Sequence, residues 1–240
     1  MAYTLVLFVG LVAGVLSGII GTGSSMLLMP VLVVFFGPQQ AVPIMAIAAI
    51  FGNLGKVLAW WREIDWRACA AYCATAVPGA ALGVRTLLAL PPRAVECALG
   101  LFFMAMVPTR RWLARRDFTL SLPHLALIGG IVGFLTGIVV STGPITVPVF
   151  MAYGLVKGAF LGTEATGSLA VYGAKVAVFA RFGALPAQVV FSGLLIGASL
   201  MLGSFAARYI VMRMPARAFK LIVDGLMLSS GLSLLWAAAR

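Results

Sequence analysis

The sequence predicts an all-α polytopic membrane protein built from two homologous halves. Of the 240 residues, 62% are hydrophobic and only 10% are charged, and the mean hydropathy is +1.11. Soluble domains carry far more charge, because about a quarter of their residues are charged. The second observation is that glycines, lysines and prolines of the first half recur in the second half at a nearly constant offset. Composition therefore indicates the class of protein, and the repeat indicates its architecture.

Apolar segments long enough to cross a bilayer, roughly 20 residues each, recur along the whole chain. Two of them, 3–36 and 123–154, are too long for one simple crossing, and small residues interrupt both. No polar segment is long enough to fold alone, so we expect one transmembrane domain over residues 1–240. The predicted segments are 3–36, 40–61, 67–88, 93–109, 123–154, 157–180, 185–210 and 216–238.

An internal repeat relates the two halves, which we place at about 3–112 and about 123–240. The stretch GTGSSMLLMPVL at 21–32 matches VSTGPITVPVF at 140–150, which is one residue shorter. Glycines and lysines match at an offset of 119 residues. The matching positions are Gly10 with Gly129, Gly14 with Gly133, Gly18 with Gly137, Lys56-Val57 with Lys175-Val176, and LPPRAV at 90–95 with MPARAF at 214–219.

The positions of the basic residues distinguish two topologies. If segments 3–36 and 123–154 each cross once, the halves are parallel; if each enters the membrane and returns as a broken or re-entrant helix, the halves are inverted-topology repeats. With Lys56 and Lys175 set aside as lying within spans, single crossings divide the other 15 basic residues eight to seven, and hairpins divide them eleven to four. The positive-inside rule of the bacterial inner membrane favours hairpins, with both termini periplasmic. The eleven are Arg62, Arg67, Arg110, Arg111, Arg115, Arg116, Lys157, Arg208, Arg213, Arg217 and Lys220.

The breaks in the two long segments predict an anion-binding site. Non-helical backbone is tolerated at membrane depth only where protein buries it or water reaches it. A helix that begins there presents unpaired N–H groups and the positive end of its dipole, which attract anions. Two such breaks form the midplane site of many secondary transporters, whereas close helix packing is the alternative interpretation. The candidate binding residues are Gly21, Gly23, Ser24 and Ser25 in the first break and Ser141, Thr142 and Gly143 in the second.

Four ionisable residues inside predicted spans are further candidates. Lys56 and Lys175 are related by the repeat and can balance the charge of a substrate anion, or their side chains can snorkel to the interface. Glu164 and Asp224 are candidates for carrying a coupling proton. An ionised Glu164 beside an anion is unfavourable, so this residue must be protonated or paired with a cation. The alternatives are structural: a lysine partner for Glu164 and small-residue neighbours for Asp224.

Other classes of protein find little support in the sequence. One His and six scattered acidic residues give little from which to build a catalytic site, and no nucleotide-binding motif is present. Cys69, Cys73 and Cys97 lack the paired spacing of a metal site, and no basic face interleaved with aromatic residues indicates nucleic-acid binding. We expect no enzyme activity, cofactor or metal, and the expected partners are a small anion and membrane lipids, with a homodimer left open. An accessory membrane subunit or a membrane-embedded enzyme is the alternative function.

The two breaks also carry a resemblance to a known family. A glycine-containing break followed by proline, repeated in each half of a chain of this length, resembles the sulfite exporter TauE/SafE family of bacterial membrane permeases. The resemblance covers essentially the whole chain, although family members have runs of glycine where this sequence has GTGSS and STGP. It implies a secondary transporter, usually an exporter, of sulfite, organosulfonate or thiosulfate across the inner membrane. It leaves open the particular anion, the coupling ion and the direction.

Overall fold

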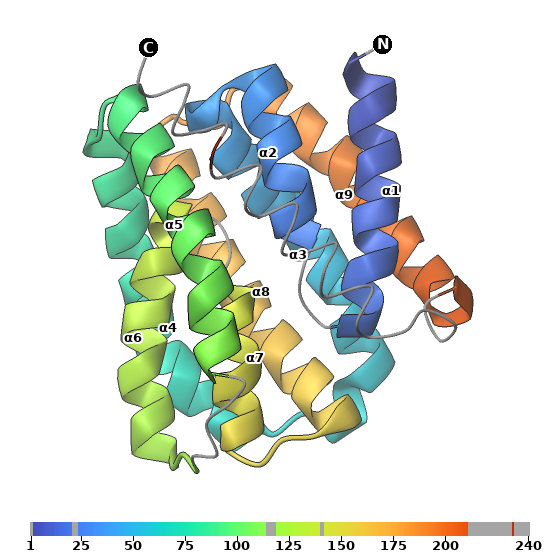
Figure 1. Ribbon diagram of the computed structural model, residues 1–240, viewed down its shortest axis with the longest axis vertical. Coiled ribbons are helices and arrows are strands. Elements are labelled where there is room, and N and C mark those ends of the chain that lie inside the picture. The colour runs from blue at the N-terminus through green and yellow to red at the C-terminus, as the bar shows by residue number, and fades with distance from the viewer. Residues whose placement is uncertain (1, 21–23, 114–118, 140–141, 211–231, 233–240) are drawn as a thin grey trace.

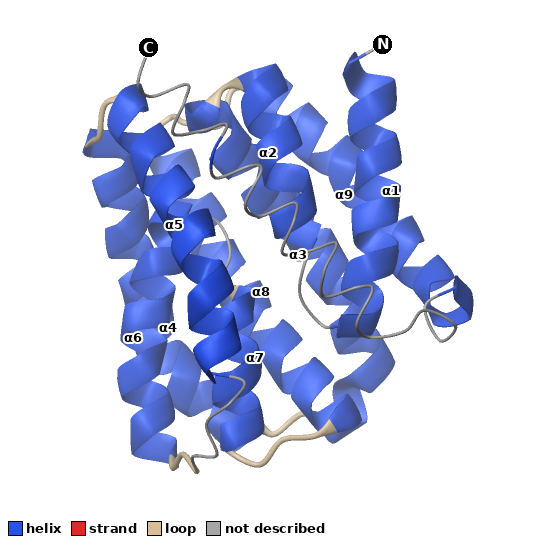
Figure 2. Ribbon diagram, viewed as in Figure 1, coloured by secondary structure: helices blue, strands red, loops and turns tan. Residues whose placement is uncertain are grey.

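The computed structural model describes residues 2–20, 24–113, 119–139, 142–210 and 232. These residues form helices joined by short connections, and they contain no strand (Figures 1 and 2). The predicted all-helical class is therefore confirmed. The helices are α1 (Ala2–Ile20), α2 (Ser24–Phe36), α3 (Pro38–Trp60), the 3-10 turn η1 (Trp61–Glu63), α4 (Trp66–Ala89), α5 (Pro92–Leu113), α6 (Leu122–Val139), α7 (Gly143–Ala152), α8 (Lys157–Arg181) and α9 (Ala187–Ile210).

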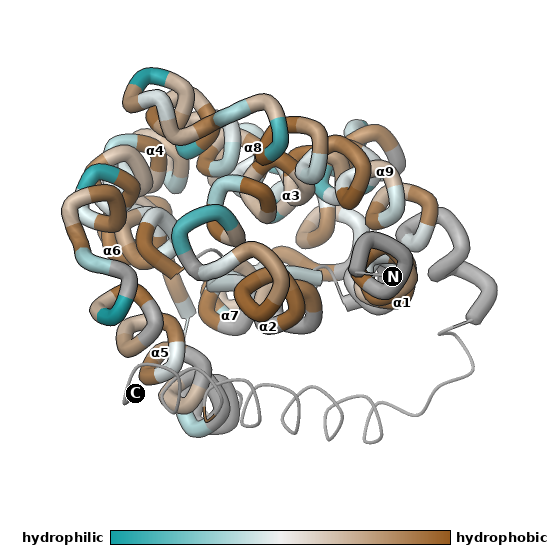
Figure 3. Tube along the Cα trace, turned by 90° about the horizontal axis from the view of Figure 1, so that it is seen from above, coloured by the Kyte–Doolittle hydropathy of each residue, from teal (hydrophilic) through white to brown (hydrophobic). Residues whose placement is uncertain are grey.

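Several helices have the length and the apolar surface of membrane spans. In the part of the chain that the structure describes, three stretches meet both criteria: Gln39–Leu58, Trp66–Ala89 and Leu122–Val139. Large apolar side chains are exposed on the outside of the bundle, among them Phe8, Leu127 and Phe191. Figure 3 shows the same property, since brown, apolar residues run along the outer as well as the inner sides of the helices. Such an exterior is suited to lipid rather than water.

The predicted breaks separate α1 from α2 and α6 from α7. At 1.5 Å per residue, the 10 residues of α7 extend only about 15 Å, half the hydrocarbon thickness of a bilayer. The amide of Leu120, just before α6, donates to the carbonyl of Ala152, the last residue of α7, at 2.9 Å. The start of α6 and the end of α7 therefore lie together, and the segment folds back as a helical hairpin.

The first helix of each half packs on a helix of the other half. Helix α1 lies along α9, and α6 lies along α4, while α3 and α8 pack against each other between these pairs. The repeated glycines spaced four residues apart in α1 and α6, which we call the glycine stripes, allow this close approach. A Cβ atom at Gly133 would collide with the carbonyl oxygen of Ala76, and a Cβ atom at Gly14 would collide with the carbonyl oxygen of Leu200. These two contacts correspond to each other under the repeat. Residues 41–49 of α3 are all buried, so the core is centred on this helix.

We expect Gly133→Val to separate α6 from α4. The two backbones approach too closely for a larger side chain, and overpacking of this kind costs about 1 to 3 kcal/mol of unfolding free energy. Thermal unfolding of the purified protein in detergent measures the loss. Gly52→Val in α3 is the matched control, because nothing lies within 4 Å of a Cβ built there. Equal destabilisation by both variants would contradict the close-packing interpretation.

Candidate functional site

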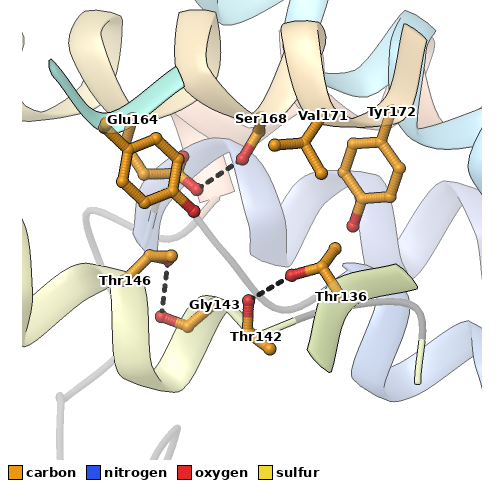
Figure 4. Close-up of a pocket in the computed structure, with 9 residues that line it drawn as sticks. Thr136, Thr142, Gly143, Thr146, Glu164, Ser168, Val171 and Tyr172 are labelled. Carbon is orange, nitrogen blue, oxygen red and sulfur yellow. Dashed lines mark hydrogen bonds between the residues drawn. The ribbon is translucent and has the colours of Figure 1, made fainter. Parts of the chain in front are cut away.

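A small cavity lies between α8 and the break that separates α6 from α7 (Figure 4). Its volume is about 20 Å³, enough for one water molecule. In Figure 4 the residues of α8 form one wall, and the residues of α6 and α7 form the wall opposite. Most of the lining side chains carry a hydroxyl or carboxyl group. They are Tyr72, Thr136, Thr142, Gly143, Thr146, Glu164, Ser168, Val171 and Tyr172.

The break contributes a pair of buried threonines. The Thr136 hydroxyl donates to the carbonyl of Val132 at 2.7 Å, and the Oγ1 atoms of Thr136 and Thr142 are 2.6 Å apart. A hydroxyl has one proton to donate, and that of Thr136 is already used, so Thr142 is the donor in the second bond. The pair joins the last turn of α6 to the residue that precedes α7 and thereby holds the two sides of the break together.

The start of α7 offers fewer backbone donors than a broken helix ordinarily does. The amides of Ile145 and Thr146 donate to the carbonyl of Thr142 at 2.8 and 3.0 Å. Pro144 has no amide hydrogen, and the hydroxyl of Thr146 donates to the Gly143 carbonyl at 3.1 Å. A ligand at this break would therefore meet side chains and the helix dipole more than a row of free amides.

The opposite wall of the cavity is built around Glu164, whose side chain is buried. Its Oε1 atom accepts a hydrogen bond from the Ser168 hydroxyl at 2.9 Å. Its Oε2 atom lies 3.8 Å from Nζ of Lys56 in α3 and accepts no hydrogen bond. Of the two possibilities for Glu164, protonation or pairing with a cation, the structure supplies a nearby cation, and it is a lysine of the other half.

A hydrogen bond from the start of α4 holds the first turns of α8. The amide of Asp65 donates to the buried Thr163 hydroxyl at 2.9 Å. The carboxylate of Asp65 accepts hydrogen bonds from the amides of Arg67 and Ala68, both at 3.0 Å, and so caps the start of α4. Because Thr163 immediately precedes Glu164, this contact fixes the position of Glu164 along the helix axes relative to Tyr72 of α4.

Lys175 lies one turn beyond the cavity and is completely buried. Its ammonium group donates to the carbonyl of Thr136 at 2.5 Å and lies 5.5 Å from the ring centroid of Tyr172. Among the described residues, no carboxylate lies within 4.0 Å of the Lys175 ammonium group. The alternative that these lysines snorkel to the interface is wrong, since Lys56 is also buried.

The repeat makes the charge arrangement of the two halves directly comparable. Lys56 and Lys175 occupy the same position in the two halves, but the position equivalent to Glu164 is Met45, which is fully buried in α3. Likewise, Ala49 stands where the second half has Ser168. At these two positions the first half is apolar where α8 is polar, and among the described residues a carboxylate lies within 4.0 Å of Lys56 but not of Lys175.

The structure brings together some of the predicted residues and not others. Thr142, Gly143 and Glu164 line the cavity, while Lys175 and Lys56 contact its walls. Ser24 and Ser25 begin α2 and are not among the residues that line it. The predicted residues Gly21, Gly23, Ser141 and Asp224 lie outside the described residues.

Sequence reasoning missed the hydroxyl groups of the cavity: Thr136, Thr146, Ser168 and the two tyrosines, Tyr72 and Tyr172. Ser168 and Tyr172 follow Glu164 at intervals of four residues, which places them on one face of a helix. That spacing is a signal from which both could have been predicted. Thr136 and Tyr72 offer no such signal, because their approach depends on how α4 and α6 pack.

Comparison with known proteins gives a family match over nearly the whole chain. The profile of the family described as Sulfite exporter TauE/SafE matches residues 6–234. The match includes both breaks, both buried lysines and Glu164. Searches of curated proteins and of solved structures gave no match.

Proposed function

Because the chain belongs to the sulfite exporter TauE/SafE family, we propose that it is a secondary transporter of small sulfur-containing oxyanions. The substrate class comprises sulfite, organosulfonates and thiosulfate. The proposed direction is outward across the bacterial inner membrane. The proposed site lies between α8 and the α6–α7 break, where Lys175, Thr136 and Thr142 meet.

The observation that carries this proposal is the buried ammonium group of Lys175. A buried charge is costly unless a counter-charge and hydrogen bonds compensate it. The described residues around Lys175 supply a carbonyl and an aromatic face but no carboxylate. An anion bound beside the break would supply the missing negative charge. The dipole at the start of α7 favours the same sign of ligand.

The size of the cavity bears on the transport cycle. A volume of about 20 Å³ holds a water molecule but not a sulfur with its oxygens. Binding therefore requires α8 and the α6–α7 hairpin to move apart, for example by breaking the hydrogen bond between Thr136 and Thr142. We propose that such a separation opens the site during the transport cycle, as in alternating-access transporters.

We further propose that the halves are inverted-topology repeats. The exchange of first helices between halves supports an internal two-fold relation. In Figure 1, α1 begins at the top of the molecule and α6 begins at the bottom, so the equivalent helices run in opposite directions. The α5–α6 and α7–α8 connections meet through the Leu120–Ala152 hydrogen bond, and Gly158 packs on Trp60 near the α3–α4 connection. These connections and the helix ends beside them carry seven of the 17 basic residues, which supports placing them on the cytoplasmic face: Arg62, Arg67, Arg110, Arg111, Arg115, Arg116 and Lys157.

The first test is uptake of sulfite, thiosulfate and methanesulfonate into proteoliposomes, with Lys175→Gln compared with wild type. Loss of one charged hydrogen-bond donor costs about 1.5 to 3 kcal/mol, so we expect the affinity of the transported anion to fall roughly 10- to 150-fold. Met45→Glu should weaken binding as well, because the repeat predicts that residue 45 lies near Lys175 as Glu164 lies near Lys56.

Met45→Gln is the matched control for the added negative charge, since it introduces a polar side chain of the same size. It should retain more binding than Met45→Glu if charge is the cause. The absence of flux of all three anions through wild-type protein would overturn the proposed function. Undiminished affinity in Lys175→Gln would instead move the anion site away from this lysine.

The second test concerns topology. Reporter fusions at Arg240 and in the loop between α5 and α6 should place the C-terminus in the periplasm and the loop in the cytoplasm. The reason is the eleven-to-four division of basic residues that hairpins produce. Cytoplasmic signals from both fusions would mean that the repeats are parallel.

A further inference from the structure

The buried carboxylate of Glu164 is only half satisfied. Oε1 accepts a hydrogen bond from Ser168, whereas Oε2 accepts none and faces Lys56 at 3.8 Å. Charge-assisted hydrogen bonds between ammonium and carboxylate groups are shorter, at about 2.7 to 2.9 Å. Only 3% of the surface of Glu164 is exposed. Hydrogen bonds from the protein therefore satisfy one of the two carboxylate oxygens and leave the other without a donor.

The fold does not need a carboxylate at this position. The repeat places Met45 at the equivalent point of α3, where it is fully buried in the apolar core, and places Ala49 where the second half has Ser168. The helix packing is therefore achieved once with an acidic side chain and once without. A buried acid that packing does not require, inside a predicted membrane span, marks a functional site.

Glu164 lines the same cavity as Thr142 and Thr136. An oxyanion bound between these threonines and α8 would be a close neighbour of the carboxylate. Two negative charges that are close neighbours in a buried site repel strongly, and this repulsion favours protonation of the acid. Protonation would also convert Oε2 from an acceptor without a hydrogen bond into a hydroxyl that can donate to the anion.

We propose that Glu164 binds a proton together with the substrate anion, so that one proton moves with each anion. This inference rests on the proposed function and identifies the coupling ion of the same site. The proton enters from the aqueous phase that delivers the anion, resides on the Glu164 carboxylate while the anion is bound, and leaves with it on the other side. Lys56, no longer opposite a carboxylate, then adds its positive charge to the occupied site.

The groups that face Glu164 are consistent with one titrating site. Helix α3 contributes Lys56, and α4 contributes Tyr72, with Cys73 one residue further along. On α8 itself, Tyr172 lines the cavity and Lys175 lies beyond it. The described parts of α6 and α7 place no titratable side chain in the cavity. Glu164 is therefore the sole acid among the described residues that line the site.

The test is proton movement during anion uptake. Proteoliposomes containing a pH-sensitive dye receive an inward gradient of the transported anion, with the membrane potential clamped by potassium and valinomycin. We expect the lumen to acidify as the anion enters. Anion flux without acidification, or with alkalinisation, would overturn the inference, and both outcomes are read from the wild-type protein.

Two variants refine the test. Glu164→Gln imitates the protonated side chain, so we expect anion flux to continue while the acidification per transported anion is lost. If Glu164 is ionised in the empty site, anion binding must take up a proton, so the anion affinity of wild type should fall about tenfold for each unit by which the pH rises. The anion affinity of Glu164→Gln should not show this dependence. Glu63→Gln, at an exposed carboxylate of η1, is the matched control and should retain both acidification and pH dependence.

The failures of the two proposals are distinguishable. Absence of flux for every anion in wild type contradicts transport itself, whereas flux with no proton movement contradicts only the role of Glu164. If Glu164→Gln does not fold, the dye measurement on wild type still decides the question. Acidification that persists in a folded Glu164→Gln protein would assign the proton to another residue.

Discussion

The site depends on keeping the ammonium group of Lys175 inside an apolar bundle. Its hydrogen bond to the Thr136 carbonyl attaches α8 to the last turn of α6, immediately before the chain breaks. The break in turn is held by the threonine pair, which joins α6 to the residue before α7. A charge, a carbonyl and two hydroxyls thus form one connected network at the junction between α6 and α7. Because each member has few alternative partners, the geometry of the break and the burial of the lysine support each other.

The scaffold around this network is formed by exchange between the halves. Helix α6 can approach α4 closely because glycines face backbone carbonyls along the contact, and α1 approaches α9 in the same way. Such contacts leave little freedom for one helix to slide on the other. The hairpin partner α7 is short and packs less extensively, which makes it the more suitable element to move. The tightly packed pairs, α1 with α9 and α4 with α6, are suited to support the structure, and the short helix α7 is suited to move.

Much of the fold could be predicted from sequence, because its signals are local or periodic. Segment lengths, the two breaks and the glycine stripes gave helix boundaries close to those observed, and the burial of Lys175 and Glu164 in spans identified two central residues. The cavity itself could not be predicted, because it depends on which faces meet. Lys56 and Glu164 are far apart in sequence and approach only because α3 packs on α8. Thr136 lies in the last turn of an apolar helix, and nothing in its local sequence shows that its hydroxyl meets that of Thr142.

The difference between the halves explains how a repeated scaffold can hold one asymmetric site. Both halves contribute a lysine at the same position, so the framework supplies two buried positive charges. Two positions that are equivalent under the repeat differ, because α8 has Glu164 and Ser168 where α3 has Met45 and Ala49. Glu164 faces Lys56 of the opposite half, whereas no carboxylate among the described residues lies within 4.0 Å of the Lys175 ammonium group. A symmetric pair of acids would neutralise both lysines and remove the positive charge that an anion needs, whereas two methionines would leave two buried cations to be compensated. In the proposed site, the single acid faces Lys56, where a bound proton would alter the balance of charge, and Lys175 has no carboxylate within 4.0 Å among the described residues.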